Sequence, residues 1–381
     1  MSTVYLDNAA TTPLRREVRA EMEAVFAERW GNASSRHRRG VAARELLDRA
    51  RERVARTVGA RPEHVVFTSG GTEANNLALR GLTRRREARS IWIGPTEHAS
   101  VRACAEALAG DGLELRRGQL DARGDLDLAR LEGDLDEGTA LVAQLLVSNE
   151  FGTIYDLPRA AALVRARAPH ALLHVDAVQA AGKLALSLFE LGADSLSLSA
   201  HKIGGPQGIG ALVLARELPL EPLIHGGGQE GGLRSGTENL AGAVGLGKAL
   251  ELAESERART FERLSELRRA LRAGLERIEG LELLELGDPD RQQPGILAVL
   301  VPGAPAEVWL HHLDARGVVV GVGSACQANK RETSPAFAAA GLSEDRARRV
   351  LRLSLSGANT EEEVARAIAA LEEVAAELAT L

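Results

Sequence analysis

The stretch SLSLSAHKIGGPQGIGALVL, residues Ser195–Leu214, contains an alternating apolar run, a polar step and a glycine-rich turn. Similar apolar runs recur along the chain, each separated from the next by a helical pattern or a turn. They are HVVFTS (His64–Ser69), SIWIGP (Ser90–Pro95), ALVAQLLVS (Ala140–Ser148) and ALLHVDA (Ala171–Ala177). This rhythm predicts an α/β fold with a mostly parallel sheet and helices on both of its faces.

Polar residues close each of these runs. Ligands of a parallel α/β sheet bind beyond the carboxyl ends of its strands, so we expect these residues to converge on one cleft. They are Thr68 and Ser69, Glu97 and His98, Asn149 and Glu150, Asp176, and His201 and Lys202.

The pattern of the sequence changes near Glu254. The segment ESERARTFERLSELRRALRAGLERIEG has leucines at helical spacing and charges between them, which predicts an amphipathic helix. Short strand patterns follow, and a final helix begins with a capping box from Thr360 to Glu363. We expect a large domain over residues 15–254 and a smaller C-terminal α/β domain over residues 255–381, joined by an N-terminal arm of residues 1–14.

Composition excludes several classes of partner and site. The 381 residues carry a formal net charge of −6 with arginines along the whole chain, so we expect neither nucleic acid nor an anionic membrane as a partner. The first residues resemble no signal peptide, and no apolar run is long enough to span a bilayer, which favours a cytoplasmic location. Cys104 and Cys326 lie far apart without metal-ligand spacing, which predicts neither a disulfide nor a metal site.

Lysine is scarce in this chain. Only Lys183, Lys202, Lys248 and Lys330 occur, and arginine supplies the other basic residues. An amine can lose its proton and form an imine, whereas a guanidinium cannot. Lys202 follows a strand and precedes glycines that allow a ligand to approach the backbone, so it is a candidate for Schiff-base chemistry.

Two further features fit an electron-sink cofactor such as pyridoxal phosphate. Asp176 ends the preceding strand pattern and could pair with a protonated ring nitrogen, although a carboxylate here could equally cap a helix. The turn FTSGGTEANN places Gly71 and Thr72 at a helix N-terminus, where backbone N–H groups can bind a phosphate. Asp176 and Lys202 on successive strand ends favour the cofactor interpretation.

An ordered series of motifs resembles the cysteine desulfurases of the class V aminotransferase group, which are fold-type I pyridoxal phosphate enzymes related to aspartate aminotransferase. The resemblance runs from Tyr5 to Glu363. The motifs are YLDNAATTPL, GNASSRHRRG, FTSGGTEANN, EHASV, SNEFGT, HVDAVQAAGK, SAHKIGGPQGIGAL, GGGQEGGLRSGTEN, GSAC and RLSLSGANTEEE. The GSAC motif narrows the match to desulfurases.

The resemblance implies a role for each matched cofactor residue. Lys202 would form the imine with the cofactor and later move the substrate Cα proton. Asp176 would keep the pyridine nitrogen protonated, Gln179 would bond to the ring hydroxyl, and His98 would stack on the ring. The residues implied at the phosphate are Gly71, Thr72, Ser199, His201 and, from a second subunit, Thr237. A homodimer with shared active sites follows.

The resemblance also implies the substrate and sulfur sites. Asn149 and Arg352 match residues that receive the substrate carboxylate, and Asn32 is a further candidate at the substrate. Cys326 would take the sulfur of L-cysteine as a persulfide, release L-alanine, and deliver the sulfur to an acceptor protein for iron-sulfur cluster assembly or thiolation. Cys104, on an apolar helical stripe, is expected to be a core residue.

Two alternatives to this function stay open at this point. Another class V activity, such as a selenocysteine lyase, an aminotransferase or an epimerase, would use Lys202 without Cys326. A non-catalytic scaffold that binds the cofactor would need neither. The sequence departs from the family pattern at Ala33, Ser148, Gly231 and the step from Thr333 to Pro335, none of which matches a cofactor contact.

Overall fold

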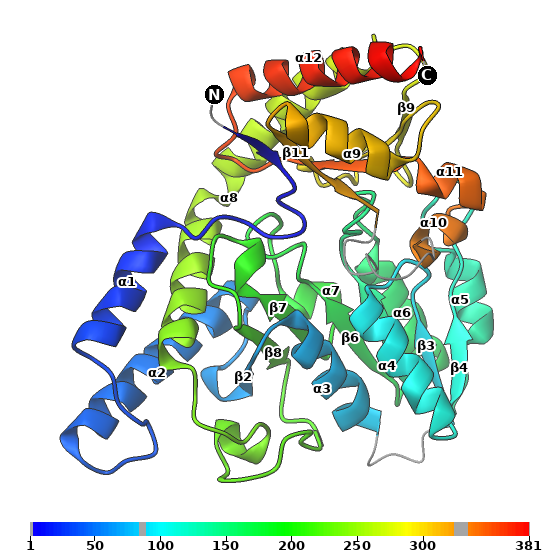
Figure 1. Ribbon diagram of the computed structural model, residues 1–381. Helices are drawn as coiled ribbons and strands as arrows, with labels where there is room; N and C mark the ends of the chain where they lie inside the picture. Colours follow the sequence, from blue (N-terminus) through cyan, green and yellow to red (C-terminus); the bar gives the residue numbers. More distant parts are fainter. Residues whose placement is uncertain (1–2, 84–88, 324–333, 381) are drawn as a thin grey trace.

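The computed structural model describes residues 3–83, 89–323 and 334–380, which form two sheets with their helices (Figure 1). The larger sheet has seven strands in the order β2-β8-β7-β6-β5-β3-β4. Only β8 runs antiparallel to its neighbours. The strands are β2 (Val65–Thr68), β3 (Ser90–Ile93), β4 (Glu114–Arg117), β5 (Thr139–Leu145), β6 (Leu172–Asp176), β7 (Ser195–Ser199) and β8 (Gly210–Leu214).

Helices cover both faces of this sheet, as the sequence predicted. Along β5, Leu141 and Ala143 belong to one apolar core and Val142 belongs to another, because successive side chains of a strand point to opposite faces. The first core contains α3 (Gly71–Thr83) and α4 (Ala99–Gly110). The second contains α1 (Arg16–Ala27), α2 (Arg38–Val58), α5 (Leu128–Asp134), α6 (Leu157–Arg167), α7 (Leu188–Leu191) and the first part of α8 (Leu240–Leu275). The mostly parallel α/β architecture is confirmed.

The smaller sheet has five strands in the order β1-β11-β12-β10-β9. Its strands are β1 (Val4–Leu6), β9 (Glu282–Leu284), β10 (Ile296–Leu300), β11 (Val318–Val322) and β12 (Val350–Ser354). The N-terminal arm joins this sheet because β1 pairs in parallel with β11. Its helices are α9 (Ala306–Ala315), α10 (Pro335–Ala339), α11 (Glu344–Arg348) and α12 (Glu361–Leu378). The predicted capping box is present, since Thr360 and Glu363 exchange side-chain and backbone hydrogen bonds at the start of α12.

The long helix α8 connects the two parts of the fold. It begins at Leu240 after an Asn239 cap, so the prediction of a helix that starts near Glu254 is wrong. The glycines in this first part have a low helix propensity, so the sequence does not predict it as a helix. They allow close packing, because a Cβ at Gly245 would lie 2.8 Å from the sulfur of Met22. The predicted division between residues 254 and 255 thus falls inside one continuous helix, and it stays a prediction.

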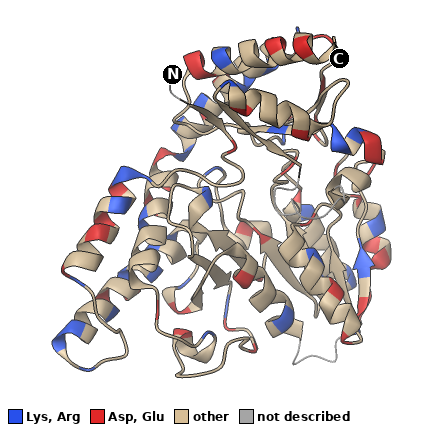
Figure 2. Ribbon diagram, in the orientation of Figure 1, with Lys and Arg blue, Asp and Glu red and all other residues tan. Residues whose placement is uncertain are grey.

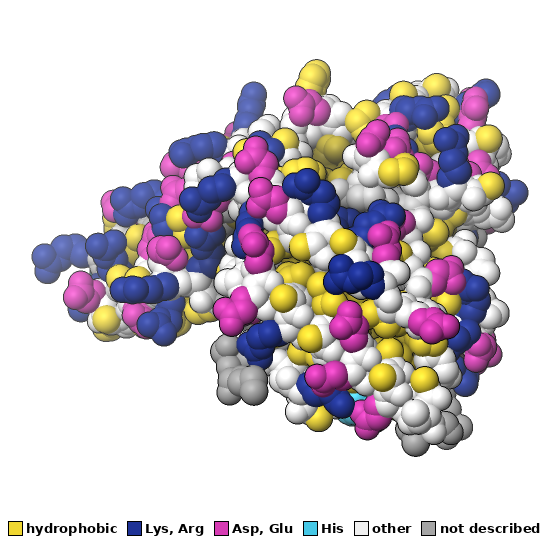
Figure 3. All heavy atoms as spheres, turned by 90° about the horizontal axis from the view of Figure 1, so that it is seen from above, with side chains coloured by type: hydrophobic (Ala, Val, Ile, Leu, Met, Phe, Trp, Pro, Cys, Tyr) yellow, Lys and Arg dark blue, Asp and Glu magenta, His cyan; other side chains and the backbone are white. Residues whose placement is uncertain are grey.

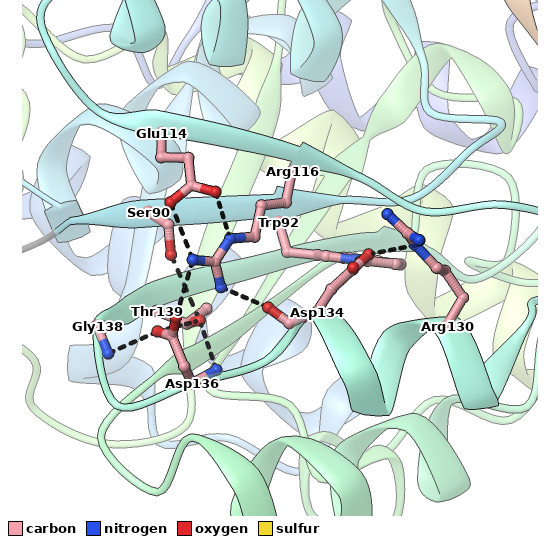
Figure 4. Close-up of polar contacts among 9 residues, drawn as sticks. All are labelled: Ser90, Trp92, Glu114, Arg116, Arg130, Asp134, Asp136, Gly138 and Thr139. Atoms are coloured by element: carbon pink, nitrogen blue, oxygen red, sulfur yellow. Dashed lines mark hydrogen bonds and ion pairs between the residues drawn. The ribbon is translucent and has the colours of Figure 1, made fainter.

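The outer strand β4 ends the larger sheet with a polar cluster (Figure 4). Arg116 binds Glu114 on its own strand and Asp136 in the turn before β5. This guanidinium lowers the pKa of both carboxylates. The indole N–H of Trp92 on β3 donates to the side chain of Asp134 at 3.4 Å. Charged side chains of this kind protect an edge strand from pairing with another chain.

Charged residues lie mainly on the outer helices of both parts (Figure 2). Seen from above, Lys and Arg alternate with Asp and Glu over most of the surface, and basic side chains are denser at the end formed by α1 and α2 (Figure 3). Within the described residues, no helix combines the length and apolarity required to cross a membrane.

Candidate active site

A cavity of about 310 Å³ lies at the carboxyl ends of β5, β6 and β7. The N-terminal turns of α3 and α4, the N-terminal arm and strand β12 complete its wall. Ten site residues predicted from the sequence line it: Gly71, Thr72, His98, Asn149, Asp176, Gln179, Ser199, His201, Lys202 and Arg352. Folding therefore gathers residues from both sheets around one space.

Three other predicted site residues are not placed in this cavity. Asn32 and Thr237 are exposed on the surface and do not line it. The Asn32 side chain instead accepts a hydrogen bond from the backbone of Ser34. Cys326 lies outside the described residues. The described chain resumes at Ser334, which does line the cavity.

The predicted convergence of all five strand ends is correct for four of them. Thr68 and Ser69, at the end of β2, do not reach the cavity. The Thr68 hydroxyl donates to the carbonyl of Gly70 at 3.0 Å, and the backbone of Ser69 donates to Glu73. The polar atoms of this strand end are therefore used within the turn, and the start of α3 faces the cavity in their place.

Asp176 ends β6 with a buried carboxylate that is 7% exposed. Its Oδ1 accepts from the backbone N–H of Val178 at 3.0 Å, and its Oδ2 accepts from the Asn75 side chain at 2.7 Å. These two N–H donors, one to each oxygen, fix the orientation of the carboxylate. Asp176 is thus held as a hydrogen-bond acceptor at the wall of the cavity.

His98 caps the N-terminus of α4. Its Nδ1 accepts a hydrogen bond from the backbone N–H of Ser100 at 3.2 Å, so the proton of a neutral imidazole belongs on Nε2. Burial lowers the pKa of His98, and the positive charge of Lys202 also lowers it, against the effect of Asp176. The ring is therefore neutral at physiological pH and suited to lie against an aromatic ligand.

Lys202 lies in the short 3₁₀ helix that follows β7. Its ammonium donates to the backbone carbonyls of Ala9 at 2.6 Å and Ala10 at 2.7 Å. The N-terminal arm therefore holds this amine at the cavity. The neighbouring His201 lies 3.1 Å from the Thr11 hydroxyl, and burial together with the charge of Lys202 lowers the pKa of His201 to about 4.

A second amine lies behind the cavity and was not predicted as a site residue. Lys183 donates to Gln179 Oε1 at 2.9 Å, and Gln179 Nε2 donates to the Ala9 carbonyl at 2.8 Å. Burial and the charge of Lys202 lower the pKa of Lys183 to about 7. The scarcity of lysine was the sequence signal that could have identified it.

The start of α3 provides an anion site. The first backbone N–H groups of α3, including those of Gly71 and Thr72, have no carbonyl acceptor within the helix. They also lie at the positive end of the helix dipole. A Cβ at Gly71 would lie 2.8 Å from a methyl group of Val178, so only glycine allows the helix to begin this close to the β6 loop. Ser199, at the end of β7, is buried beside this turn.

Arg352 reaches the cavity from β12 and is 4% exposed. It donates to Asp7 Oδ1 at 2.8 Å and to the carbonyl of Asn149 at 3.0 Å. Gly321 on the neighbouring strand leaves room for this ion pair, because a Cβ there would lie 2.6 Å from the Asp7 carboxylate. The guanidinium is thus held at the cavity, with its Nε–H group available for a carboxylate.

Two buried acids also line the cavity and were noted only as strand-end residues. Burial and the nearby Asp176 raise the pKa of Glu97 well above its usual range. Burial also raises the pKa of Glu150, which accepts a hydrogen bond from Ser334 at 2.8 Å. Their position after strand patterns indicated that they lie near the cleft, but their burial is visible only in the structure.

The whole chain was compared with known proteins. The class V aminotransferase family matches residues 4–367. A cysteine desulfurase IscS of Dictyoglomus turgidum is 37% identical over 381 residues, covering 99% of this chain and 96% of the relative. The chain belongs to the cysteine desulfurase family. A solved NifS-like protein covers 100% of both chains with a TM-score of 0.92 at 35% identity.

Another solved structure similar to this chain is that of SspA in complex with cysteine, with a TM-score of 0.82 at 31% identity. It matches 94% of this chain and 100% of its own. The family comparisons confirm the fold class, the dependence on pyridoxal 5′-phosphate and the cysteine desulfurase activity predicted from the sequence.

The residues of the cavity fit the cofactor of the cysteine desulfurases. Pyridoxal phosphate needs an anion site, an acceptor for its ring N–H group and an amine that can form an imine. The residues that line the cavity meet these three needs. The start of α3 is the anion site, the carboxylate of Asp176, fixed by two hydrogen bonds, is the acceptor, and Lys202 is the amine. Gly71, where a Cβ would collide with Val178, keeps the α3 end of this cradle open.

The buried His174 predicts a pH dependence of stability. It lies in the middle of β6, and burial lowers its pKa to about 4 from a usual value of 6.5. Below pH 6.5 the unfolded chain binds a proton that the folded chain does not, so stability falls as the pH drops from 6.5 to about 4 and changes no further below that. Over this pH range the free energy of unfolding falls by ~3 kcal/mol.

Urea unfolding of the cofactor-free protein at several pH values measures this loss. A His174→Gln variant, which cannot titrate, is expected to lose ~3 kcal/mol less than the wild type between pH 6.5 and 4. Equal pH slopes for the two proteins would show that His174 does not titrate in this way.

Proposed function

We propose that this cavity converts L-cysteine to L-alanine and that Cys326 receives the sulfur. The observation that carries the proposal is the meeting of Asp176, His98 and Lys202 with Arg352 around one space. The first three residues meet the needs of the cofactor, and Arg352 adds a cation for the carboxylate of an amino acid. An amino-acid substrate explains why the smaller sheet contributes a residue to this cavity.

Each residue has a role in the reaction. When bound, pyridoxal phosphate supplies an electron sink for the bonds at the substrate Cα. Lys202 removes the Cα proton and returns it, and Asp176 holds the ring N–H group. Arg352 and Asn149 bind the substrate carboxylate and orient the Cα–H bond toward Lys202. The neutral ring of His98 would help to hold the cofactor ring and would exclude water from it.

The sulfur step joins Cys326 to the substrate. The Cys326 thiolate attacks the substrate sulfur, a new S–S bond forms, and the Cβ–S bond of the substrate breaks. The substrate carbon skeleton keeps the electron pair and takes a proton to become alanine, while the enzyme holds a persulfide, so that no outside oxidant is needed. The position of Ser334 at the cavity supports this role, because it follows closely after Cys326 in sequence.

A homodimer would complete the site. Thr237 is exposed and outside the cavity of its own chain, so we propose that it contacts the cofactor phosphate of a second subunit. Asn32, also exposed, stays a candidate substrate residue. The persulfide then passes to an acceptor protein, for iron-sulfur cluster assembly or for thiolation of a carrier. A cytoplasmic location fits this role and stays a prediction.

Alanine release from L-cysteine, with a thiol acceptor present, tests the function. The Cys326→Ala variant is expected to bind the cofactor as the wild type does and to release alanine at least about 100-fold more slowly, because the sulfur has lost its nucleophile. Cys104→Ala is the matched control. Cys104 is a buried residue of the α4 core whose pKa is raised by burial, so its loss leaves the rate unchanged.

The possible outcomes separate the alternatives. Equal rates in the wild type and Cys326→Ala would favour a lyase that does not pass sulfur through this thiol, for which selenocysteine is the substrate to test. A protein that binds the cofactor and releases no alanine from cysteine or selenocysteine would favour a different class V activity or the scaffold role.

A further inference from the structure

A chain of buried polar side chains lies directly behind Asp176. Its central residue is Asn75, in the second turn of α3, which is 1% exposed. Asn75 Nδ2 lies 2.7 Å from Asp176 Oδ2 and 2.8 Å from the hydroxyl of Ser100. Asn75 Oδ1 lies 3.0 Å from Nε2 of His174. Every polar atom of this amide therefore has a partner inside the protein.

The chemistry of these partners fixes the orientation of the amide. An ionised carboxylate can only accept, so the Asn75 atom facing Asp176 must be the nitrogen, and the oxygen must face His174. His174 then carries its proton on Nε2 and donates it to Asn75. His174 Nδ1 lies 2.9 Å from the Ser195 hydroxyl, which can donate to it. The amide therefore cannot flip without placing its oxygen against the Asp176 carboxylate.

The same amide also orients His98. Since Asn75 donates its second proton to the Ser100 hydroxyl, the hydroxyl proton of Ser100 is free to point to His98 Nδ1, which lies 2.8 Å away. The hydroxyl and the backbone N–H of Ser100 then share Nδ1 as their acceptor, which keeps the His98 proton on Nε2. One buried side chain thus supports two groups that face the cofactor.

We infer that Asn75 is a positioning residue for the cofactor ring: it donates to Asp176 directly and to His98 through Ser100, and His174 locks its orientation. The inference rests on the proposed function, because it assumes that Asp176 and His98 face pyridoxal phosphate. The residue acts by donating protons, so a substitution that preserves its shape and removes the donors must impair the site.

Cofactor binding by three variants tests this inference. Cofactor-free protein is titrated with pyridoxal phosphate between pH 6 and pH 9. The dissociation constant of Asn75→Ala is expected to rise about tenfold over the wild type, from the loss of hydrogen bonds to charged and cofactor-facing groups. Asn76→Ala is the matched control, since Asn76 donates only to backbone carbonyls of Thr72 and Ser100, and its dissociation constant stays within about twofold of the wild type.

The Asn75→Asp variant separates the effect of the hydrogen-bond donors of Asn75 from the effect of its side-chain shape. It preserves the shape of Asn75 but sets a second carboxylate against Asp176, so it is expected to bind the cofactor more weakly than Asn75→Ala at high pH. Its affinity improves at low pH, where the two carboxylates can share a proton. A merely structural role predicts that Asn75→Asp resembles the wild type at every pH.

Two results would overturn the inference. One is wild-type affinity in Asn75→Asp across the pH range, and the other is an Asn75→Ala dissociation constant no higher than that of Asn76→Ala. If Asn75→Asp does not fold, the comparison of the two alanine variants decides alone. Failure of the proposed function looks different: the wild type itself would not bind pyridoxal phosphate, or would bind it and release no alanine.

Discussion

Lys202→Ala protein is expected to lose the release of alanine from cysteine by at least about 10⁴-fold, because one amine both links the cofactor and moves the substrate proton. After borohydride reduction, wild-type protein is expected to carry the cofactor covalently on the peptide that contains Lys202, and the variant to carry none. Mass spectrometry of the digested protein measures this directly.

Two control variants separate chemistry from charge and fold. Lys202→Arg keeps a cation that can donate to the carbonyls of Ala9 and Ala10, but a guanidinium forms no imine, so it is expected to be as inactive as Lys202→Ala. Lys248→Ala removes an amine that pairs with Glu251 on α8, and it keeps full activity. A covalent adduct in Lys202→Ala would show that another amine holds the cofactor, and the buried Lys183 is a candidate because the charge of Lys202 acts on it.

Asp176→Asn protein is expected to release alanine about 10²- to 10³-fold more slowly and to bind the cofactor more weakly. The amide cannot balance a protonated ring nitrogen, and the loss of one partner of a buried charge pair typically costs this much. The local geometry adds to the effect. Val178 and Asn75 each present an N–H group to a different oxygen of Asp176, so an Asn amide would set its own donor against one of them.

Asp194→Asn is the matched control for Asp176→Asn. Asp194 is a buried carboxylate just before β7, where Arg165 and Arg216 bind it. Its replacement is expected to lower the unfolding free energy and to leave cofactor affinity unchanged, because it does not line the cavity. Thermal unfolding and cofactor titration measure the two effects separately. Equal rates of alanine release by Asp176→Asn and the wild type would show that Asp176 has no role in the reaction.

The sequence predicted most of the larger sheet and its site because both depend on local patterns. Strand β6 is mostly apolar, with His174 at its centre and Asp176 at its end, and β7 alternates before His201 and Lys202. Helix α12 has its capping box within four residues. The start of α8 was missed because its glycines are poor helix formers in isolation, and their close packing against α1 and α2 outweighs that cost.

The residues behind the site were missed for a different reason. The contact of Asn75 with Asp176 and His174 depends on how α3 lies across β6, which no local spacing reveals. Lys183 shows the same limit: its position after Gln179 is local, but its burial and the effect of the Lys202 charge on it depend on the packing of the whole fold.

The sequence by itself determined the α/β class, the strand ends that carry Asp176 and Lys202, and the family, because periodicity, turn residues and ordered motifs are properties of neighbouring positions. Only the tertiary structure decided which polar groups meet. Arg352 of the smaller sheet reaches the cavity with Asp7 of the N-terminal arm, and that arm also supplies the carbonyls that hold Lys202. These contacts join distant parts of the chain, and they form only when both sheets have packed around the same space.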